Sequence, residues 1–561
     1  MEKRALLALV LSLLVLVFWE YFFGLFHVIE PPQQETVTTT TPPSAESPST
    51  AQPPKAPGLP PDIASPQALP KDRLTDLGQH FQSWLVEASD YRMQILSPGA
   101  RINSFRLNKF RQEVDPESPP MEMVPTQASG YLPMAVDLLH HPDWQLSTRS
   151  FESRSPAQLT LPSTDSPQNF SLSTEVPERL RVTKSFTLTP SAYFMDVEIR
   201  LENLASESLS DQMGISFFFQ PYAGPKEESS NNPSHLAVFA KGTLETFSVK
   251  DLQKKETIFK TPMDWVGYED NYFIQAVAPL EKEGYQVIPR ILDADKGLLQ
   301  VVCLTDPFQL EAGKDKTFKM RLYLGPKNLN ELDRADHNLS HSVDYGWFTV
   351  LAKPLLHLLI WCYKYTHNYG VAIILITVLI KLVFWPLTHK SYQSMKMMKK
   401  IQPKIAQIRE KHKDDREKLN TELMGVYRTY KVNPMGGCLP MVLQIPVFFA
   451  LYRMLNGAVE LRHEPFIWWI NNLTAPDRLN IGIPIPYLGG IPVLTILMGI
   501  SMFLQQKMTP SAGDPRQDQM MMLMPVVFTF FFINFPSGLV LYWLVNNVLS
   551  IAQQYWINRR P

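Results

Sequence analysis

The feature that most constrains this chain is a lysine inside an apolar run of 19 residues. The run extends from Tyr369 to Leu387 and contains Lys381. At ~1.5 Å per residue, a helix of this length crosses a hydrocarbon layer of ~30 Å. A lysine near the centre of such a span costs roughly 2.5–3.5 kcal/mol on insertion scales. The run therefore predicts a membrane-spanning helix in which the charge of Lys381 needs an explanation.

Two interpretations of this lysine stay open. Lys381 lies six residues before Leu387, so its long side chain could reach toward the membrane surface. Alternatively, it could face a water-filled cavity within the protein. Thr377 stands one helical turn before Lys381 on the same face, which makes a polar stripe and not one stray charge.

The charges divide the chain into two parts of opposite sign. Residues 31–348 carry 29 Lys and Arg against 41 Asp and Glu, whereas residues 349–561 carry 22 against 10. We therefore expect an acidic soluble part followed by a basic membrane part. The three cysteines, Cys303, Cys362 and Cys438, are too few for a disulfide framework.

The N-terminal residues 1–28 predict a signal anchor. Lys3 and Arg4 precede an uncharged run from Ala5 to Trp19, and no small-residue cleavage site follows. We therefore expect a retained span with the N-terminus inside. Residues 29–74 are rich in Pro, Thr, Ser and Gln and too poor in apolar residues for a core, which predicts a disordered tether.

Residues 75–345 show the two-residue periodicity of half-buried strands. In residues 194–203, Val197, Ile199 and Leu201 alternate with charged side chains. Comparable strand-forming segments occur at residues 181–189, 298–306 and 317–325. Many short strands separated by turn residues predict a large antiparallel β-sandwich.

A possible metal site in this region is weakly supported. Asp333, His337 and His341 follow one another at a spacing of four, which would place them on one face of a helix. Two histidines four apart can bind zinc, but no third-ligand motif accompanies them, so an exposed polar helix is the favoured interpretation. We expect no catalytic residue, cofactor or metal in this chain.

The membrane part begins with a helix that is too interrupted to span. Residues 346–368 predict an amphipathic helix in the outer interface, and residues 369–387 form the second span. Residues 388–433 hold 12 Lys and Arg against 5 Asp and Glu and predict a helical hairpin that turns near residues 413–415. This charge could suit nucleic acid, but basic residues beside spans usually mark the cytoplasmic side.

Residues 434–561 predict spans three to six, separated by short loops and followed by a C-terminal tail. Residues 519–558 are uncharged and break at 535–538 (FPSG), which predicts a tight hairpin of the last two spans. The fold class is thus a six-span α-helical membrane protein with a large β-sandwich domain. This arrangement satisfies the positive-inside rule.

The last span carries a polar face. Its members, at spacings of four, four and three, are Tyr542, Asn546, Ser550 and Gln553. With Thr377, Lys381 and Gln444 they could form hydrogen bonds between packed helices or line a hydrated groove. We favour the groove because Lys381 has no acidic partner in a neighbouring span.

Such a groove fits a protein that guides other polypeptides into the membrane better than it fits a pump. No nucleotide motif and no acidic proton relay accompany it. Partition of an apolar segment into lipid yields roughly −0.3 to −0.6 kcal/mol per Leu-like residue, so insertion needs no ATP. A small-solute transporter or channel and an envelope enzyme built around the β-domain remain as alternatives.

Three stretches make a family resemblance specific. They are LIKLVFWPLTHKSYQSMKMMKKIQPKI at 379–405, KVNPMGGCLPMVLQIPVFFALYRML at 431–455 and FPSGLVLYWLVNN at 535–547. These stretches resemble the YidC/Oxa/Alb family of membrane protein insertases. The leading span, the tether and the β-domain are similar to the Gram-negative form, so that the resemblance covers nearly the whole chain.

The resemblance implies an insertase and chaperone that moves hydrophobic segments from the cytoplasm into the bilayer through a hydrated groove open to lipid. It would work alone or with the Sec translocon, without nucleotide hydrolysis. The implied partners are nascent membrane proteins, the Sec translocon with its accessory subunits, the ribosome, the signal-recognition-particle receptor and lipids, but not nucleic acid directly. The implied location is the bacterial inner membrane, multi-pass, with both termini cytoplasmic and the large domain periplasmic.

The resemblance also implies which residues act. Lys381 stands where the family usually has arginine, and lysine keeps the charge but loses the bidentate fork. The other residues expected to line the groove or touch the substrate are Thr377, Cys438, Pro440, Gln444, Ile445, Pro446, Tyr542, Trp543, Asn546 and Ser550. The 388–433 hairpin corresponds to a mobile cytoplasmic region of the family, and the β-domain to a sandwich similar in fold to sugar-modifying enzymes.

Overall fold

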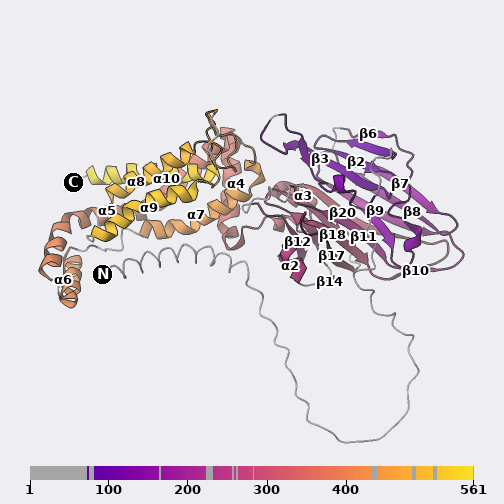
Figure 1. Cartoon of the computed structure of the whole chain (residues 1–561), viewed down its shortest axis with the longest axis horizontal. Coiled ribbons are helices and arrows are strands. Elements are labelled where there is room, and N and C mark those ends of the chain that lie inside the picture. The colour runs from indigo at the N-terminus through magenta and orange to yellow at the C-terminus, as the bar shows by residue number, and fades with distance from the viewer. Residues whose placement is uncertain are drawn as a thin grey trace, which may run out of the picture. The chain divides into compact units, whose positions relative to one another are not determined.

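The computed structural model describes most of the chain after residue 80 (Figure 1). The described residues are 73–74, 81–115, 117–162, 166–222, 232–254, 258–260, 263–281, 284–412, 415–430, 432, 439–482, 488–509 and 515–559. The predicted signal anchor and nearly all of the predicted tether lie outside them. Both therefore stay predictions.

Residues 83–326 form the sheets of the predicted sandwich, and nearly all of the strand pairs are antiparallel. In spatial order the largest sheet contains β13 (Thr243–Phe247), β12 (His235–Ala240), β15 (Trp265–Glu269), β16 (Phe273–Pro279), β20 (Asp315–Pro326), β9 (Phe194–Asn203), β8 (Leu180–Leu188) and β7 (Gln168–Val176). The second contains β14 (Phe259–Lys260), β17 (Tyr285–Asp293), β18 (Leu298–Thr305), β11 (Met213–Phe219) and β5 (Ala135–Leu138). These two sheets share one apolar core.

Two smaller sheets complete this part of the molecule. One contains β4 (Pro120–Glu122), β3 (Arg101–Arg111), β2 (Tyr91–Leu96), β1 (Ser83–Glu87) and β6 (Gln158–Thr160), with β1 and β6 parallel. The other pairs β10 (Leu209–Asp211) with β19 (Phe308–Leu310). The connections include η2 (Gln127–Ser129), η3 (Pro142–Trp144) and the helix α2 (Val249–Lys254).

The alternation in the sequence explains which strands are half-buried. In β9, the side chains of Val197, Ile199 and Leu201 are buried and the intervening charged side chains are not. Strands β11 and β18 instead bury every residue; both are mostly apolar, and the buried Gln300 amide donates to the Ser216 hydroxyl. Antiparallel pairing of β9 with β8 and β20 fixes this register.

The expectation that Asp333, His337 and His341 share a helix face is wrong. Helix α3 covers only Leu329–Ala335, and a separate turn, η4, covers Leu339–Ser342. Asp336, His337 and Asn338 between them all have positive φ, which ends the helix. The ring of His341 stacks on Phe239 at 4.6 Å. Within the described ranges, no group of three or more His, Cys, Asp or Glu side chains is placed to hold a metal ion.

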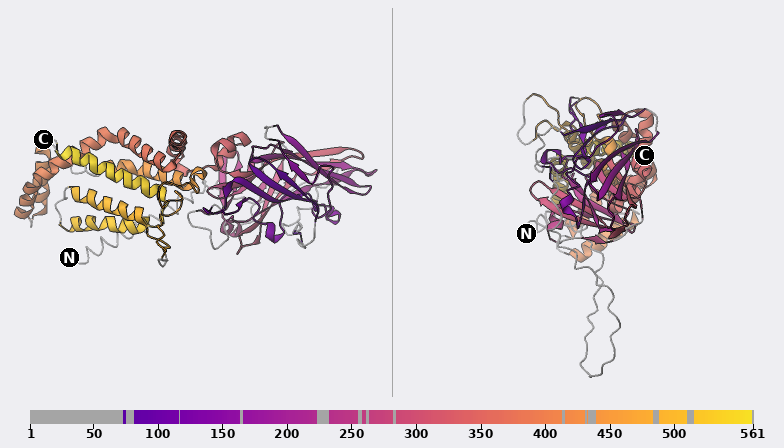
Figure 2. Two further views of the ribbon diagram at one scale, coloured as in Figure 1. Left: turned by 90° about the horizontal axis from the view of Figure 1, so that it is seen from above. Right: turned by 90° about the vertical axis from the view of Figure 1, so that its right-hand side faces the viewer.

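Most of the described chain after residue 345 is helical. After η5 (Gly346–Phe348) it contains α4 (Thr349–Thr366), α5 (Tyr369–Lys411), α6 (Arg416–Thr429), α7 (Leu439–Gly457), η7 (Val459–Leu461), α8 (Val493–Met508), α9 (Pro515–Phe532) and α10 (Ser537–Arg559). Helices α5 and α7 to α10 run alongside one another, whereas α4 lies across one end of them and α6 lies at the other end (Figures 1 and 2).

Helix α5 is one element where we expected two. It continues through Pro386 and Pro403 from the predicted span into the first arm of the hairpin. Asn368 caps its start by accepting a hydrogen bond from the Val371 amide. The arms α5 and α6 pack through Ile401 and Ile405, against which the apolar side chains of α6 lie.

Two of the described helical segments are long and apolar enough to cross a membrane. They are Gly346–Thr366, which includes α4, and α5, while α8 and the Gln519–Phe532 stretch of α9 are apolar but shorter. The sequence predicts that residues 346–368 are too interrupted to span, yet Gly346–Thr366 is long and apolar enough to cross a membrane, as α5 is. The number of spans therefore stays a prediction.

Candidate functional site

Helix α10 presents a row of polar side chains that are almost wholly buried. Beyond its first two turns these are Asn546, Asn547, Ser550, Gln553 and Gln554. Three- and four-residue spacing places them on one broad face. A buried polar group without a partner costs about 1–3 kcal/mol, so the neighbouring helices have to supply partners.

Lys381 of α5 meets this face at Ser550. Its ammonium donates a hydrogen bond of 2.7 Å to the Ser550 hydroxyl, which in turn donates to the Asn546 carbonyl at 2.7 Å. Because the hydroxyl proton is directed at Asn546, the oxygen lone pairs are available to the ammonium. The Tyr392 side chain also hydrogen-bonds with Ser550. Among the described residues, no carboxylate forms an ion pair with Lys381.

Two further pairs join α10 to its neighbours on either side. Thr388 of α5 and Gln553 exchange hydrogen bonds, with the Gln553 amide donating at 3.0 Å. On the other side, the Asn547 amide donates to the Ser501 hydroxyl of α8 at 3.0 Å. These contacts are interhelical hydrogen bonds, the alternative to a groove that the sequence leaves open, so part of the polar face serves helix packing.

The structure brings Gln444 and Tyr542 together as well. The Gln444 amide donates to the Tyr542 hydroxyl at 3.0 Å, which links α7 to α10. Trp543 points elsewhere, into a cluster of aromatic rings whose centroid distances to Phe448 and Phe532 are 4.7 and 4.9 Å. Thr377 is buried and donates to the carbonyl of Ile373 in its own helix.

The remaining expected site residues lie on or before α7. The side chains of Ile445 and Pro446 are exposed. Cys438 and the side chain of Pro440 fall outside the part of the chain that the structure describes. Sequence reasoning missed Thr388 and Ser501, although Thr388 stands two helical turns after Lys381 and Ser501 interrupts an apolar helix. Both positions could therefore have been identified from the sequence.

The segment between α7 and α8 holds the starts of three helices together. The side-chain amide of Asn368, at the start of α5, donates to the Phe466 carbonyl. The backbone N–H of Ser537, at the start of α10, donates to the Ala475 carbonyl. The Asp477 carboxylate accepts from the Leu494 amide at the start of α8. These bonds fix the α5–α10 seam on which Lys381 and Ser550 meet.

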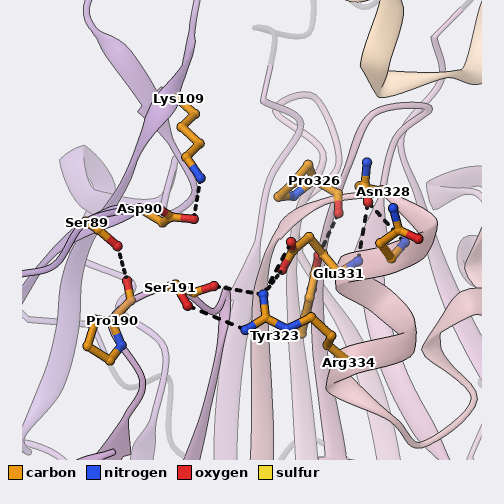
Figure 3. A network of polar contacts seen from close by, with 11 residues as sticks. Ser89, Asp90, Lys109, Pro190, Ser191, Tyr323, Pro326, Asn328, Glu331 and Arg334 are labelled. Atoms are coloured by element: carbon orange, nitrogen blue, oxygen red, sulfur yellow. Dashed lines mark hydrogen bonds and ion pairs between the residues drawn. The ribbon is translucent and has the colours of Figure 1, made fainter. Parts of the chain in front are cut away.

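A second polar network surrounds α3 in the β-rich part (Figure 3). Arg334 donates to the Ser191 carbonyl at 3.1 Å and pairs with Glu331. The Asn328 side chain caps α3 by accepting from the backbone amides that follow it. Burial raises the pKa of Glu331. These side chains hold α3 against the turn at residues 190–191 and present no group poised for chemistry.

Comparison with known proteins matches both parts of the chain. Residues 361–561 match the family model described as "60Kd inner membrane protein", and residues 83–358 match "YidC periplasmic domain". The protein of Syntrophobacter fumaroxidans named "Membrane protein insertase YidC" is 65% identical over 559 residues, covering 100% of both chains. The protein of the same name from Syntrophus aciditrophicus is 38% identical over 569 residues, again covering 100% of both. The chain therefore belongs to the YidC family of membrane protein insertases.

Proposed function

We propose that this protein inserts hydrophobic segments of nascent membrane proteins into the bacterial inner membrane. Its relatives carry the name of this activity over the full length of the chain. Insertion makes and breaks no covalent bond, and the protein is not an enzyme. The single observation that supports the mechanism is the Lys381 ammonium hydrogen-bonded to Ser550 between two helices, with no carboxylate partner among the described residues.

Lys381 offers an incoming chain one positive charge inside a helical bundle. Its contact with Ser550 favours an internal site over a side chain reaching for the membrane surface. An unpaired ammonium in apolar surroundings is costly, so it attracts water or an acidic side chain of the substrate. The apolar residues of that substrate then move into lipid, at roughly −0.3 to −0.6 kcal/mol for each Leu-like residue.

The surface that guides this movement is a hydrated, lipid-open groove. We assign to it the residues named from the sequence, which are Thr377, Lys381, Cys438, Pro440, Gln444, Ile445, Pro446, Tyr542, Trp543, Asn546 and Ser550. The pairing of Gln444 with Tyr542 and of Lys381 with Ser550 supports the assignment, since both pairs lie on the same face of α10.

The proposed topology has six spans with both termini in the cytoplasm and the β-domain in the periplasm. Helix α4 lies in the outer interface, supported by its position across the ends of the other helices (Figure 1) and by its exposed Trp361 and Tyr365. The basic α5–α6 hairpin lies in the cytoplasm. Proposed partners are the Sec translocon with its accessory subunits, the ribosome and the signal-recognition-particle receptor.

The test is insertion of a small single-span protein into liposomes that contain only this protein. Lys381→Arg should retain insertion because it keeps the charge. Lys381→Ala should slow insertion about tenfold or more, the effect of losing one charged hydrogen bond. Leu382→Ala is the matched control, since Leu382 is an exposed neighbour on the same helix. An apolar Asn546/Ser550 double variant should also be slowed.

The possible outcomes distinguish the role of Lys381 from the insertase function itself. Equal insertion by Lys381→Ala and Leu382→Ala would remove Lys381 from the mechanism while leaving the activity in place. Empty liposomes that insert as well as loaded ones would contradict the function itself. The alternative of a small-solute transporter or channel receives no support from the relatives' names, and solute flux across the same liposomes should be absent.

A further inference from the structure

Three ring side chains lie together beyond Lys381 on the seam between α5 and α10. The centroids of Trp385 and Trp556 are 6.1 Å apart in an edge-to-face arrangement, and the His389 ring is centred 6.2 Å from Trp556. No residue of this cluster belongs to the groove assigned above. We call Trp385, His389 and Trp556 the ring cluster.

The ring cluster continues the stripe that contains Lys381. Trp385 and His389 follow Lys381 at spacings of four and eight, so all three occupy one side of α5. Trp556 belongs to α10, the helix that supplies Ser550. The two helices run parallel along this seam, because Lys381 meets Ser550 and the later Lys396 donates to the later Ile557 carbonyl. The ring cluster therefore lies next to Lys381 on the side of α6, which is the proposed cytoplasmic side.

The surfaces of the two indoles are open. Trp385 is 38% exposed and Trp556 is 40% exposed, although both are large apolar side chains. Each therefore retains exposed ring surface that can cover an apolar or aromatic side chain. An aromatic contact of this kind is worth about 0.5–1.5 kcal/mol beyond the area that it buries.

His389 adds a polar group to these open rings. Its Nε2 lies 3.0 Å from the Gln393 amide nitrogen, which can only donate, so Nε2 accepts and the ring proton sits on Nδ1. That Nδ1 is buried and has no hydrogen-bond partner among the residues that the structure covers. A polypeptide that has not yet completed its helix has unpaired carbonyl oxygens, and those are the acceptors that this N–H lacks.

We propose that the ring cluster is the first contact of an incoming apolar segment on its way to Lys381. The two indoles cover an apolar or aromatic side chain of the segment. Its entry displaces the side chains that cover His389 Nδ1–H, which then donates to one of the free backbone carbonyls of the segment. This inference rests on the proposed insertase function and extends it to residues outside the groove. Tryptophans at a membrane interface also contact lipid headgroups, and lipid is therefore the competing occupant.

Photo-crosslinking in the full chain distinguishes the two occupants. A benzophenone amino acid replaces Trp385, Trp556 or, as the control, Val383, which is 74% exposed on the same helix but on another side. The probe is a radiolabelled single-span protein halted during insertion into liposomes. We expect polypeptide adducts from positions 385 and 556 well above those from 383. Adducts to lipid alone, or equal polypeptide yields from all three positions, would overturn the inference.

Insertion rates provide a second readout. Trp556→Ala and His389→Ala should each lower the initial rate about fivefold, the effect of losing one aromatic contact or one hydrogen bond. Trp556→Phe should recover most of that loss because it keeps a ring. Val383→Ala should match the unaltered protein. If the unaltered protein and both alanine variants insert equally well, the ring cluster has no role in insertion, while the proposed function stands. If the unaltered protein inserts nothing, the proposed function itself fails.

Discussion

Lys184 is a fully buried ammonium-bearing side chain in the β-rich part of the molecule. It lies on β8 and donates hydrogen bonds of 2.6 Å to the carbonyls of Gly99 and Met134. Burial and, to a smaller extent, the nearby Arg101 lower its pKa from 10.5 to about 7, while Asp137 acts in the opposite direction. A neutral amine has two N–H bonds, which is the number needed for these two carbonyls.

This lysine should make the stability of the β-domain depend on pH. Its pKa in the folded state lies below that in the unfolded chain, so between about pH 7 and 10.5 the unfolded chain binds more protons. Stability should therefore rise with pH across that window, at up to about 1.4 kcal/mol per pH unit. Lys184→Met should remove this rise and destabilise the protein, since it leaves two buried carbonyls without donors.

Urea unfolding of the intact protein in detergent, followed by tryptophan fluorescence at several pH values, measures the effect. The informative quantity is the difference between Lys184→Met and the unaltered protein, because other groups titrate equally in both. A difference that is constant from pH 7 to 10 would mean that Lys184 is charged in the folded state and that the two carbonyls, not its titration, determine its contribution.

At the scale of elements, the strands were the most predictable part of the molecule. Residues 194–203 were predicted as a strand and form β9, and the break at 535–538 separates α9 from α10. Both follow from local pattern alone. The continuity of α5 could not be predicted in this way, because Pro386 and Pro403 favour boundaries and only the packing of both halves against other helices outweighs them.

The site was predictable in its residues but less so in its contacts. The spacing of Asn546 and Ser550 indicated a polar face, and Lys381 marked the span that would meet it. Which of these residues bond to each other depends on how α5 is rotated against α10, and a single sequence carries no direct signal of that rotation. The same limit hid the ring cluster, whose members lie 167 residues apart between His389 and Trp556.

Close packing of α8 on α9 depends on one glycine. A Cβ at Gly499 would lie 2.1 Å from the Thr529 hydroxyl oxygen, which is far inside contact distance. Gly499→Ala should therefore push the two helices apart and cost about 1–3 kcal/mol of stability. The Thr529 hydroxyl cannot simply turn away without losing its bond to the Pro525 carbonyl.

The matched control exchanges the small side chain between the two helices. Gly499→Ala combined with Thr529→Gly should recover much of the lost stability, whereas Thr529→Gly alone should leave a cavity and cost less than Gly499→Ala. Thermal unfolding of the detergent-solubilised variants provides the comparison. Additive losses in the double variant would show that the two positions do not share a contact.

At the scale of the whole molecule, a few polar contacts join residues of the β-rich part to the segment after α7. Arg462 donates to the carbonyls of Arg111 and Gln112 at 2.7 and 2.9 Å. The Asn328 amide, which also caps α3, donates to the Glu460 carboxylate at 2.9 Å. More than 100 residues separate the partners in each case, so no local pattern could have revealed them.

Glu460 should make this junction sensitive to pH. Burial raises its pKa from 4.5 to about 7, and one of its oxygens is buried without a partner among the described residues. The positive charge of His357, when present, opposes this rise. We call the state in which these contacts between the β-rich part and the segment after α7 are formed the joined state. Between pH 4.5 and 7, Glu460 binds more protons in the joined state than it would in water. The junction should therefore be strongest below pH 4.5 and weaken as the pH rises through 7.

Glu460→Gln imitates the protonated side chain and keeps the bond from Asn328, so it should hold the junction closed at every pH. Pulsed electron paramagnetic resonance between spin labels at residues 250 and 383, with the native cysteines replaced, measures the effect as the width of the distance distribution. We expect the unaltered protein to give a narrow distribution at pH 5 and a broader one at pH 8. The glutamine variant should stay narrow at both, since its side chain carries no charge whose burial would oppose the joined state. A distribution that broadens equally in both proteins would assign the pH dependence to other groups, with His357 the first to be replaced.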